Sequence, residues 1–298
     1  YNYRTDRYEQ PATDFPTDVR TMALQGDTLW IGALNGLYTY QLQNRKLSPL
    51  GTKRNGLPHN TIYSIIRTGD NQIYVGTYNG LCRYIASNGK FEKIPLPVNS
   101  SQSNLFVNSL LEDTGRQCIW IGTEGYLFQY FPSTGQMKQT EAFHNNSIKS
   151  LALDGNGYLL AGTDNGLYVY HNDVTPLQHI IHDSRNIQSL TNNIIWNIFA
   201  DQEHNIWLGT DYGISLSRYN SALQFIPISQ ITGTGDGNQF YSLFRDSKGF
   251  YWFGGTNGLI RFTDPAGDKH NAIWYRMGDK TYPLSHNRIR HIYEDKEQ

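Results

Sequence analysis

Short apolar runs alternate with clusters of Gly, Asn, Asp and Ser along nearly the whole chain, and long helix-forming runs are absent. Short runs that are rich in β-branched and aromatic residues and bounded by such turn formers predict β-strands. In one stretch the pattern predicts four consecutive strands, over residues 194–200, 206–210, 214–219 and 224–228. We therefore expect an all-β chain whose consecutive strands pair in antiparallel fashion.

A sequence phrase within this stretch, Trp207-Leu208-Gly209-Thr210, recurs in similar form six times. Its shared glycine lies at six positions separated by 40 to 47 residues: Gly32, Gly76, Gly122, Gly162, Gly209 and Gly254. A repeat of this length with four predicted strands is typical of one blade of a β-propeller. The sequence thus predicts six complete four-stranded blades, in which the repeated Trp is a core residue and the repeated Gly a turn residue.

Both ends of the chain resemble partial repeats. Tyr1–Gln10 aligns with the outer strand at residues 130–139, and Leu284–Asp295 aligns with a first strand and its following Asp. Because propellers commonly close by building one blade from both termini, these ends predict a split, incomplete seventh blade. We expect one propeller domain over residues 1–298 that is a fragment of a longer chain.

Two turns between the second and third strands depart from the usual Asn-Gly. The third repeat carries Glu124-Gly125-Tyr126 and the fifth carries Asp211-Tyr212-Gly213, so each turn has a tyrosine. Tyr126 and Tyr212 are therefore candidate ligand contacts, and local packing is the alternative.

Composition narrows the classes of function. Charged residues make up 17% of the chain and the formal net charge is -1, which argues against binding to nucleic acid or to an anionic membrane. The two cysteines, Cys82 and Cys118, are too few for a disulfide framework or a zinc cluster, and we expect both to be buried.

One position near the start of each first strand varies while its neighbours do not. We expect these residues to form a ring at the mouth of the propeller channel, with cationic and aromatic side chains suited to an anionic or uronic oligosaccharide. The alternative is that they only fill gaps between blades. The seven residues are Arg20, Tyr63, Asn108, Lys149, Trp196, Tyr241 and Arg290.

Enzymatic interpretations have weaker support. His179 and His182 are close in sequence, but in a strand their side chains diverge, whereas a metal needs converging ligands. Glu124, Asp164 and Asp211 lie on successive turns and could supply a pair of acids for sugar hydrolysis. An acid before a turn glycine is also ordinary turn chemistry. We predict no catalytic residue, metal or cofactor in this chain.

The repeats resemble the two-component regulator propeller repeat. The resemblance is carried by Leu57–Ile65 leading to Ile73–Tyr84, and by Leu190–Ile194 leading to Asp201 and Trp207–Thr210. It implies the periplasmic sensor region of a hybrid two-component histidine kinase of gut anaerobes, whose later kinase, receiver and DNA-binding domains lie outside this chain. Such sensors detect breakdown fragments of polysaccharides and switch on genes for their use.

The resemblance predicts a non-enzymatic sensor with an oligosaccharide ligand, a homodimer in the full-length protein, no nucleic acid partner for this fragment and contact with the membrane only through the parent chain. Two alternatives remain at this point. One is a propeller-fold polysaccharide lyase or glycosidase, and the other is a scaffold propeller without a small ligand.

Overall fold

A computed structural model of the chain describes residues 15–50, 55–97, 105–139, 146–171, 175–186, 188–218, 223–226, 239–263, 272–281 and 283–294. The described residues contain strands and turns but no helix, and so none that could cross a membrane. The chain divides into two compact units, Gln10–Leu151 and Ala152–Gln298. They are called the N-terminal and C-terminal units below.

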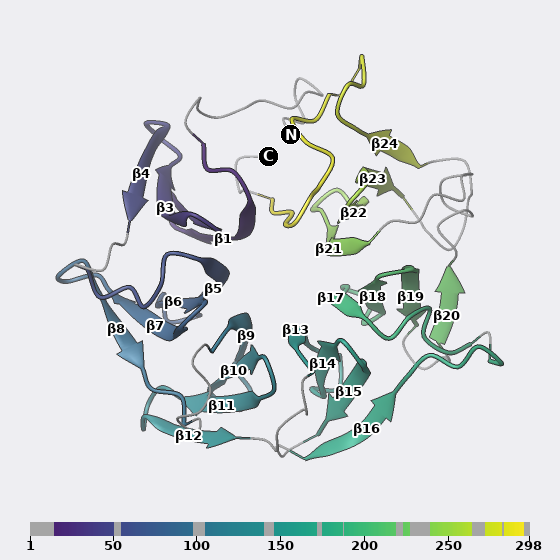
Figure 1. The fold of residues 1–298 in the computed structure, drawn as a ribbon, viewed down its shortest axis with the longest axis horizontal. Helices are drawn as coiled ribbons and strands as arrows, with labels where there is room; N and C mark the ends of the chain where they lie inside the picture. The colour runs from purple at the N-terminus through teal and green to yellow at the C-terminus, as the bar shows by residue number, and fades with distance from the viewer. Residues whose placement is uncertain are drawn as a thin grey trace. The chain divides into compact units, whose positions relative to one another are not determined.

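The strands form six antiparallel sheets of four strands each, which are the blades of a β-propeller (Figure 1). In every sheet the strands follow in sequence order from one edge to the other. This confirms the predicted all-β class and the six four-stranded repeats. In the fifth repeat the predicted strands agree with the observed ones to within two residues at each end.

The N-terminal unit contains three complete sheets. Their strands are β1 Val19–Gln25, β2 Thr28–Ala33, β3 Gly36–Gln41 and β4 Lys46–Leu50; β5 Ile62–Arg67, β6 Ile73–Thr77, β7 Gly80–Ile85 and β8 Lys90–Ile94; β9 Val107–Asp113, β10 Cys118–Thr123, β11 Leu127–Phe131 and β12 Gln136–Gln139.

The C-terminal unit contains the remaining strands, and the boundary between the units falls within β13. These strands are β13 Ile148–Leu153, β14 Leu159–Thr163, β15 Gly166–Tyr170 and β16 Pro176–Ile180; β17 Ile195–Ala200, β18 Ile206–Thr210, β19 Gly213–Ser217 and β20 Leu223–Ile226; β21 Phe240–Arg245, β22 Tyr251–Gly255, β23 Gly258–Phe262 and β24 Ile273–Tyr275.

The repeated Trp is buried, as predicted, and in three repeats its indole donates to an Asp at or just after the end of the preceding strand, whereas Trp30 donates to Gln25. Trp207 Nε1 donates to Asp201 Oδ2 at 2.9 Å, and Trp120 Nε1 donates to Asp113 Oδ2 at 3.0 Å. Burial alone would raise the pKa of Asp201, but hydrogen bonds from Trp207, Asn205 and Tyr251 hold it below its usual value. The aspartate therefore joins the turn between the first two strands to the core of its own blade.

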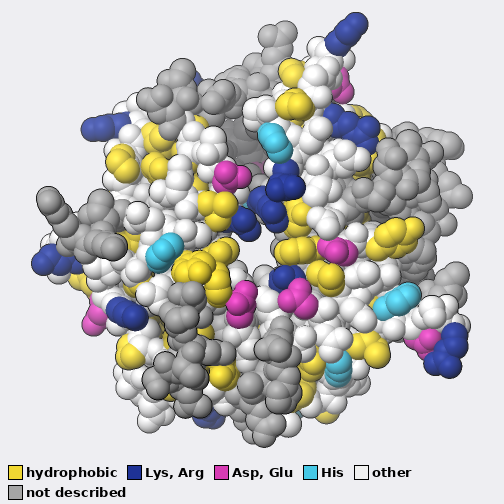
Figure 2. All heavy atoms as spheres, in the orientation of Figure 1, with side chains coloured by type: hydrophobic (Ala, Val, Ile, Leu, Met, Phe, Trp, Pro, Cys, Tyr) yellow, Lys and Arg dark blue, Asp and Glu magenta, His cyan; other side chains and the backbone are white. Residues whose placement is uncertain are grey.

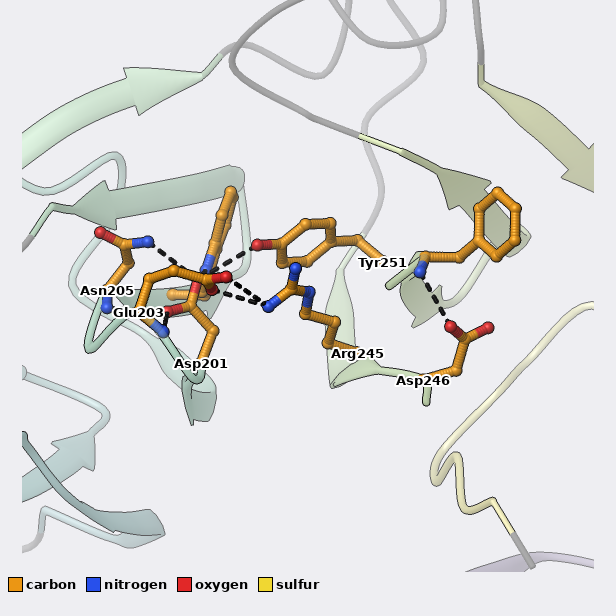
Figure 3. A network of polar contacts seen from close by, with 8 residues as sticks. Asp201, Glu203, Asn205, Arg245, Asp246 and Tyr251 are labelled. Atoms are coloured by element: carbon orange, nitrogen blue, oxygen red, sulfur yellow. Dashed lines mark hydrogen bonds and ion pairs between the residues drawn. The ribbon is translucent and has the colours of Figure 1, made fainter. Parts of the chain in front are cut away.

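Neighbouring blades of the C-terminal unit are also joined at this turn (Figure 3). The hydroxyl of Tyr251, on β22, donates to Asp201 Oδ2 at 3.2 Å, and Arg245 Nη1 lies 2.7 Å from Glu203 Oε2. The guanidinium of Arg245 also lies 5.3 Å from the centre of the Tyr251 ring. These contacts tie the β17–β18 turn to the following blade.

The repeated Gly is not a turn residue, and that prediction was wrong. It lies inside the second strand of the blade, outside the left-handed region, where the following blade leaves no room for a side chain. A Cβ on Gly76 would lie 2.7 Å from the carbonyl oxygen of Val107, and one on Gly209 would lie 2.8 Å from that of Phe240. Glycine at this position lets successive blades approach closely.

The C-terminal segment, residues 283–294, contacts β21 and β22 as the first strand of a further blade would. Ile289 covers Gly254 as Ile62 covers Gly32, since a Cβ on either glycine would lie 2.6 Å from the Cγ2 atom of that isoleucine. The amide of Ile292 donates to Ser242 Oγ at 3.0 Å, and that of Ile65 donates to Thr21 Oγ1 at 3.2 Å. The segment is not assigned as a strand, so a seventh blade is not confirmed. The predicted N-terminal contribution, Tyr1–Gln10, lies outside the described residues.

Both cysteines, Cys82 and Cys118, are free and buried, as predicted. Cys82 belongs to a cluster of buried side chains with Trp30, Val75 and Phe91. Burial raises the pKa of both thiols, which disfavours the reactive thiolate.

We predict that Gly76→Ala lowers the free energy of unfolding by about 1–3 kcal/mol, because the methyl group would collide with the backbone of Val107. Urea unfolding monitored by circular dichroism measures the change. Gly115→Ala is the matched control, since a Cβ there would meet only Asp113 Oδ1 at 3.5 Å. Equal midpoints for the two variants would contradict the close approach between blades.

Candidate functional site

Five of the seven predicted ligand residues occupy β-bulges. In these five first strands the residues on either side of the predicted one pair with consecutive residues of the second strand. Ile195 pairs with Thr210 and Asn197 with Gly209, which leaves Trp196 without a pairing partner in the strand. The bulge residues are Arg20, Tyr63, Asn108, Trp196 and Tyr241. Since bulges redirect side chains and occur often beside binding sites, this geometry sets the five residues apart from their neighbours.

Three predicted residues come together in the C-terminal unit. The rings of Trp196 and Tyr241 meet edge to face with centres 5.1 Å apart, and the guanidinium of Arg290 lies 4.0 Å from the centre of the Tyr241 ring. The indole of Trp196 donates to Asp211 Oδ1, and the hydroxyl of Tyr241 donates to Gln239 Oε1. These residues are called the aromatic–cation cluster below.

The cluster is reached from outside the protein. Trp196 and Arg290 are half-buried, whereas Tyr241 is only 9% exposed. Figure 2 shows hydrophobic side chains beside an acidic one over β17 and β21. The cluster therefore offers an aromatic edge, a cation held against an aromatic face and a carboxylate within a small area.

The other four predicted residues lie in the N-terminal unit. The guanidinium of Arg20 lies 5.8 Å from the centre of the Tyr63 ring, and Asn108 Nδ2 donates to Ser147 Oγ at 2.8 Å. Burial raises the pKa of Tyr63, and the charges of Arg20 and Glu124 act on its hydroxyl in opposite directions. Lys149 is half-buried on β13.

The two turn tyrosines have different surroundings. Tyr126 packs against a buried cluster that includes Phe128, with ring centres 5.8 Å apart, as the packing alternative anticipated. Tyr212 is 68% exposed at the tip of the β18–β19 turn. Tyr212 therefore remains accessible to a ligand, and Tyr126 supports the core of its blade.

Local contacts are made by the side chains of His179, His182 and Asp211, which are three of the five residues considered for enzymatic chemistry. A ring nitrogen of His179 lies 2.6 Å from the carbonyl oxygen of Asn165, and Nδ1 of His182 lies 2.5 Å from that of Leu190. Asp211 accepts the indole proton of Trp196, Asp164 is half-buried and Glu124 is exposed. Within the described ranges, no three His, Cys, Asp or Glu side chains are grouped to hold a metal ion.

Sequence reasoning missed several residues beside the predicted ones. Gln239 precedes β21 and binds Tyr241, whereas His59, Tyr78 and Phe106 lie in loops and turns around Tyr63. They fall outside the variable strand position that the alignment selected. Contacts between rings on different turns cannot be predicted from the spacing of residues within one repeat.

Comparison with known proteins agrees with the repeat pattern. A family model described as "two component regulator propeller" matches residues 56–79, 189–212 and 234–257. "Histidine kinase P4" of Formosa agariphila is 27% identical over 295 residues, an alignment that covers 88% of this chain and 20% of that protein. The chain thus spans only about a fifth of the curated relative it matches.

Solved structures give the same picture. Two structures of an extracellular domain from B. thetaiotaomicron, described as part of a one component system in one case and a hybrid two component system in the other, are 92% identical to this chain. They match all of it with TM-scores of 0.71 and 0.72, and the chain covers 40% of each. Virginiamycin B lyase from Staphylococcus aureus is 13% identical with a TM-score of 0.65 over 90% of the chain, which shows a shared fold alone.

The family model and the two solved structures of 92% identity agree with the predicted resemblance to two-component regulator propellers. The matching solved structures at high identity are extracellular domains, and the matching curated relative is a histidine kinase. An extracytoplasmic location agrees with the same structures.

We predict that acid weakens the hold of the C-terminal segment through His291, which follows Arg290. Burial lowers the pKa of His291 from 6.5 to about 4, so the folded protein favours the neutral ring. The neutral ring of His291 makes its full contribution to the free energy of unfolding above pH 6.5. This contribution is lost as the pH falls from 6.5 toward 4, because the unfolded chain binds the proton more readily than the folded protein.

Thermal unfolding of the wild type and His291→Ser between pH 7.5 and 4.5 checks this. Serine is suitable because four first strands carry it at the equivalent position: Ser64, Ser109, Ser150 and Ser242. The melting temperature of the wild type should fall more steeply with acid than that of the variant. Parallel curves would contradict the prediction.

Proposed function

We propose that this chain belongs to the two-component regulator propeller family as the periplasmic sensor region of a hybrid two-component histidine kinase, and that it detects oligosaccharides released from polysaccharides. The observation that supports the ligand residues is the set of five β-bulges, because each turns one side chain of its blade out of the regular pairing at the same position. A strand position is suited to specific binding where a bulge redirects the side chain and the residue type differs from blade to blade.

The aromatic–cation cluster supports an anionic sugar as ligand. Flat aromatic faces pack against pyranose rings, and a guanidinium donates two parallel hydrogen bonds to a carboxylate or sulfate group. Trp196 and Arg290 are both half-buried, so a ligand would meet them already ordered by their contacts with Asp211 and Tyr241. Preordered side chains lose little conformational entropy on binding.

Signalling would require no reaction in this part of the protein. Arg290 lies on the C-terminal segment, whereas Trp196 and Tyr241 lie on β17 and β21. A ligand that binds all three favours the arrangement in which the segment is docked. In a homodimer of the full-length sensor, such differential affinity would shift the balance between two arrangements and carry the signal across the membrane.

Calorimetry with trigalacturonic acid and a sulfated disaccharide tests the proposed ligand class. We expect Arg290→Ala to weaken binding of an anionic fragment about 10- to 100-fold, because hydrogen bonds to charged groups contribute about 1.5–3 kcal/mol. Trp196→Ala should also weaken it, through loss of ring stacking.

Arg261→Ala is the control for this experiment. Arg261 also lies over aromatic rings, 4.9 Å from the centre of Phe250 and 5.5 Å from that of Trp252, but it is not one of the bulge or cluster residues. Its removal should leave the affinity unchanged. If the cluster variants bind as the wild type does, the ligand does not bind at this cluster. If no fragment binds the wild type, a scaffold without a small ligand is favoured.

A further inference from the structure

Four aromatic rings form a continuous row in the N-terminal unit. The rings of His59 and Tyr78 have centres 4.8 Å apart and are tilted by 33°. Tyr78 and Phe106 meet edge to face at 4.2 Å, and Phe106 meets Tyr63 edge to face at 5.8 Å. The row, called the aromatic strip below, thus runs from His59 in the loop before β5, through Tyr78 and Phe106, to Tyr63 on β5.

The strip is accessible, and its residues are not among the buried members of the clusters that join the first blade to the second and the second blade to the third. His59 is exposed, and Tyr78, Phe106 and Tyr63 are half-buried. Those clusters contain other side chains, such as Ile65 and Phe91 in one and Ile121 and Phe128 in the other. Figure 2 shows hydrophobic side chains grouped over β5 and β9, with a histidine and an acidic side chain beside them.

Each end of the strip is fixed in place. Nδ1 of His59 accepts the backbone N–H of Thr61 at 3.0 Å, so Nδ1 carries no proton and the neutral ring has its proton on Nε2. Tyr63 is the bulge residue of β5, since Ile62 and Ser64 pair with consecutive residues of β6. The rings are therefore ordered before a ligand arrives, which lowers the entropy cost of binding.

We propose that the aromatic strip is a stacking platform for the flat faces of uncharged sugar rings. This inference rests on the proposed sugar-sensing function and assigns a further subsite to it. Pyranose rings present C–H groups on one face, which pack on aromatic surfaces, and a row of rings accommodates successive residues of an oligosaccharide.

Polar groups beside the strip match an uncharged sugar. His59 offers an N–H donor at one end, and the charges of Arg20 and Glu124 both reach the hydroxyl of Tyr63 at the other. Carboxylate oxygens accept hydrogen bonds from sugar hydroxyls, and guanidinium groups donate to them. Because the positive charge of Arg20 and the negative charge of Glu124 both act at this end of the strip, neither an anionic nor a cationic ligand is favoured there. The aromatic–cation cluster differs, since its cation lies directly on a ring.

Calorimetry of the chain with four uncharged hexasaccharides, of the malto, cello, manno and xylo series, tests the inference. We expect at least one to bind, and Tyr78→Leu and Phe106→Leu each to weaken its binding about tenfold. Tyr78→Phe keeps the ring and should bind within about twofold of the wild type. Tyr168→Leu is the control, because Tyr168 also stacks on a histidine, His179, at 4.0 Å on the outer strands of another blade. Circular dichroism confirms that each variant is folded.

Two results would contradict the proposal that the aromatic strip binds uncharged sugars. One is equal binding of the hexasaccharide by the wild type and both leucine variants, and the other is no binding of any uncharged hexasaccharide. In the second case, anionic fragments that still bind and are lost in Arg290→Ala would leave the proposed sensor function intact. Failure of both kinds of sugar would refute both proposals.

Discussion

The close approach of successive blades at one glycine is the constraint on which the rest of each repeat depends. The first residue of the next blade occupies the space where a Cβ on Gly32, Gly76 or Gly122 would lie. The residue that pairs with this glycine across the sheet is small and polar, as in the pairs Ser64–Gly76 and Ser242–Gly254. The bulge falls directly before that polar residue. The contact that brings blades together is thus adjacent to the position that turns a side chain outward.

The same constraint explains how the C-terminal segment is held without pairing as a strand. Ile289 covers Gly254, the amide of Ile292 donates to Ser242, and Glu294 accepts hydrogen bonds from the amide and hydroxyl of Ser247 at 2.9 and 2.8 Å. Glu112 accepts the amide of Gly69 in the equivalent way. The blade surface therefore specifies how the next strand docks, and this docking places Arg290 on Tyr241.

The repeats, the strand positions and the burial of the Trp could all be predicted from sequence, because apolar periodicity and turn residues act locally. The glycine was assigned to a turn because its neighbour in space is about 30 residues away in sequence, as with Gly76 and Val107. The variable position was found by alignment alone. Its bulge has no local signal, since residues as different as Arg20, Asn108 and Trp196 occupy it and none is glycine. The packing of blades, rather than the residue itself, creates the bulge.

Blade packing fixes the position of each bulge but not the residue that occupies it, which would let one fold serve different ligands. The glycine contact and its polar partner fix where the side chain emerges, so the bulge residue can change without loss of blade packing. In the C-terminal unit the bulges present Trp196 and Tyr241 beneath a cation, and in the N-terminal unit a bulge presents Tyr63 in a row of rings flanked by opposite charges. Different side chains thus lie at equivalent positions, while the glycine contact and its small polar partner recur from blade to blade. The proposed ligand contacts can then vary at little cost in stability, because they are not the residues that hold the blades together.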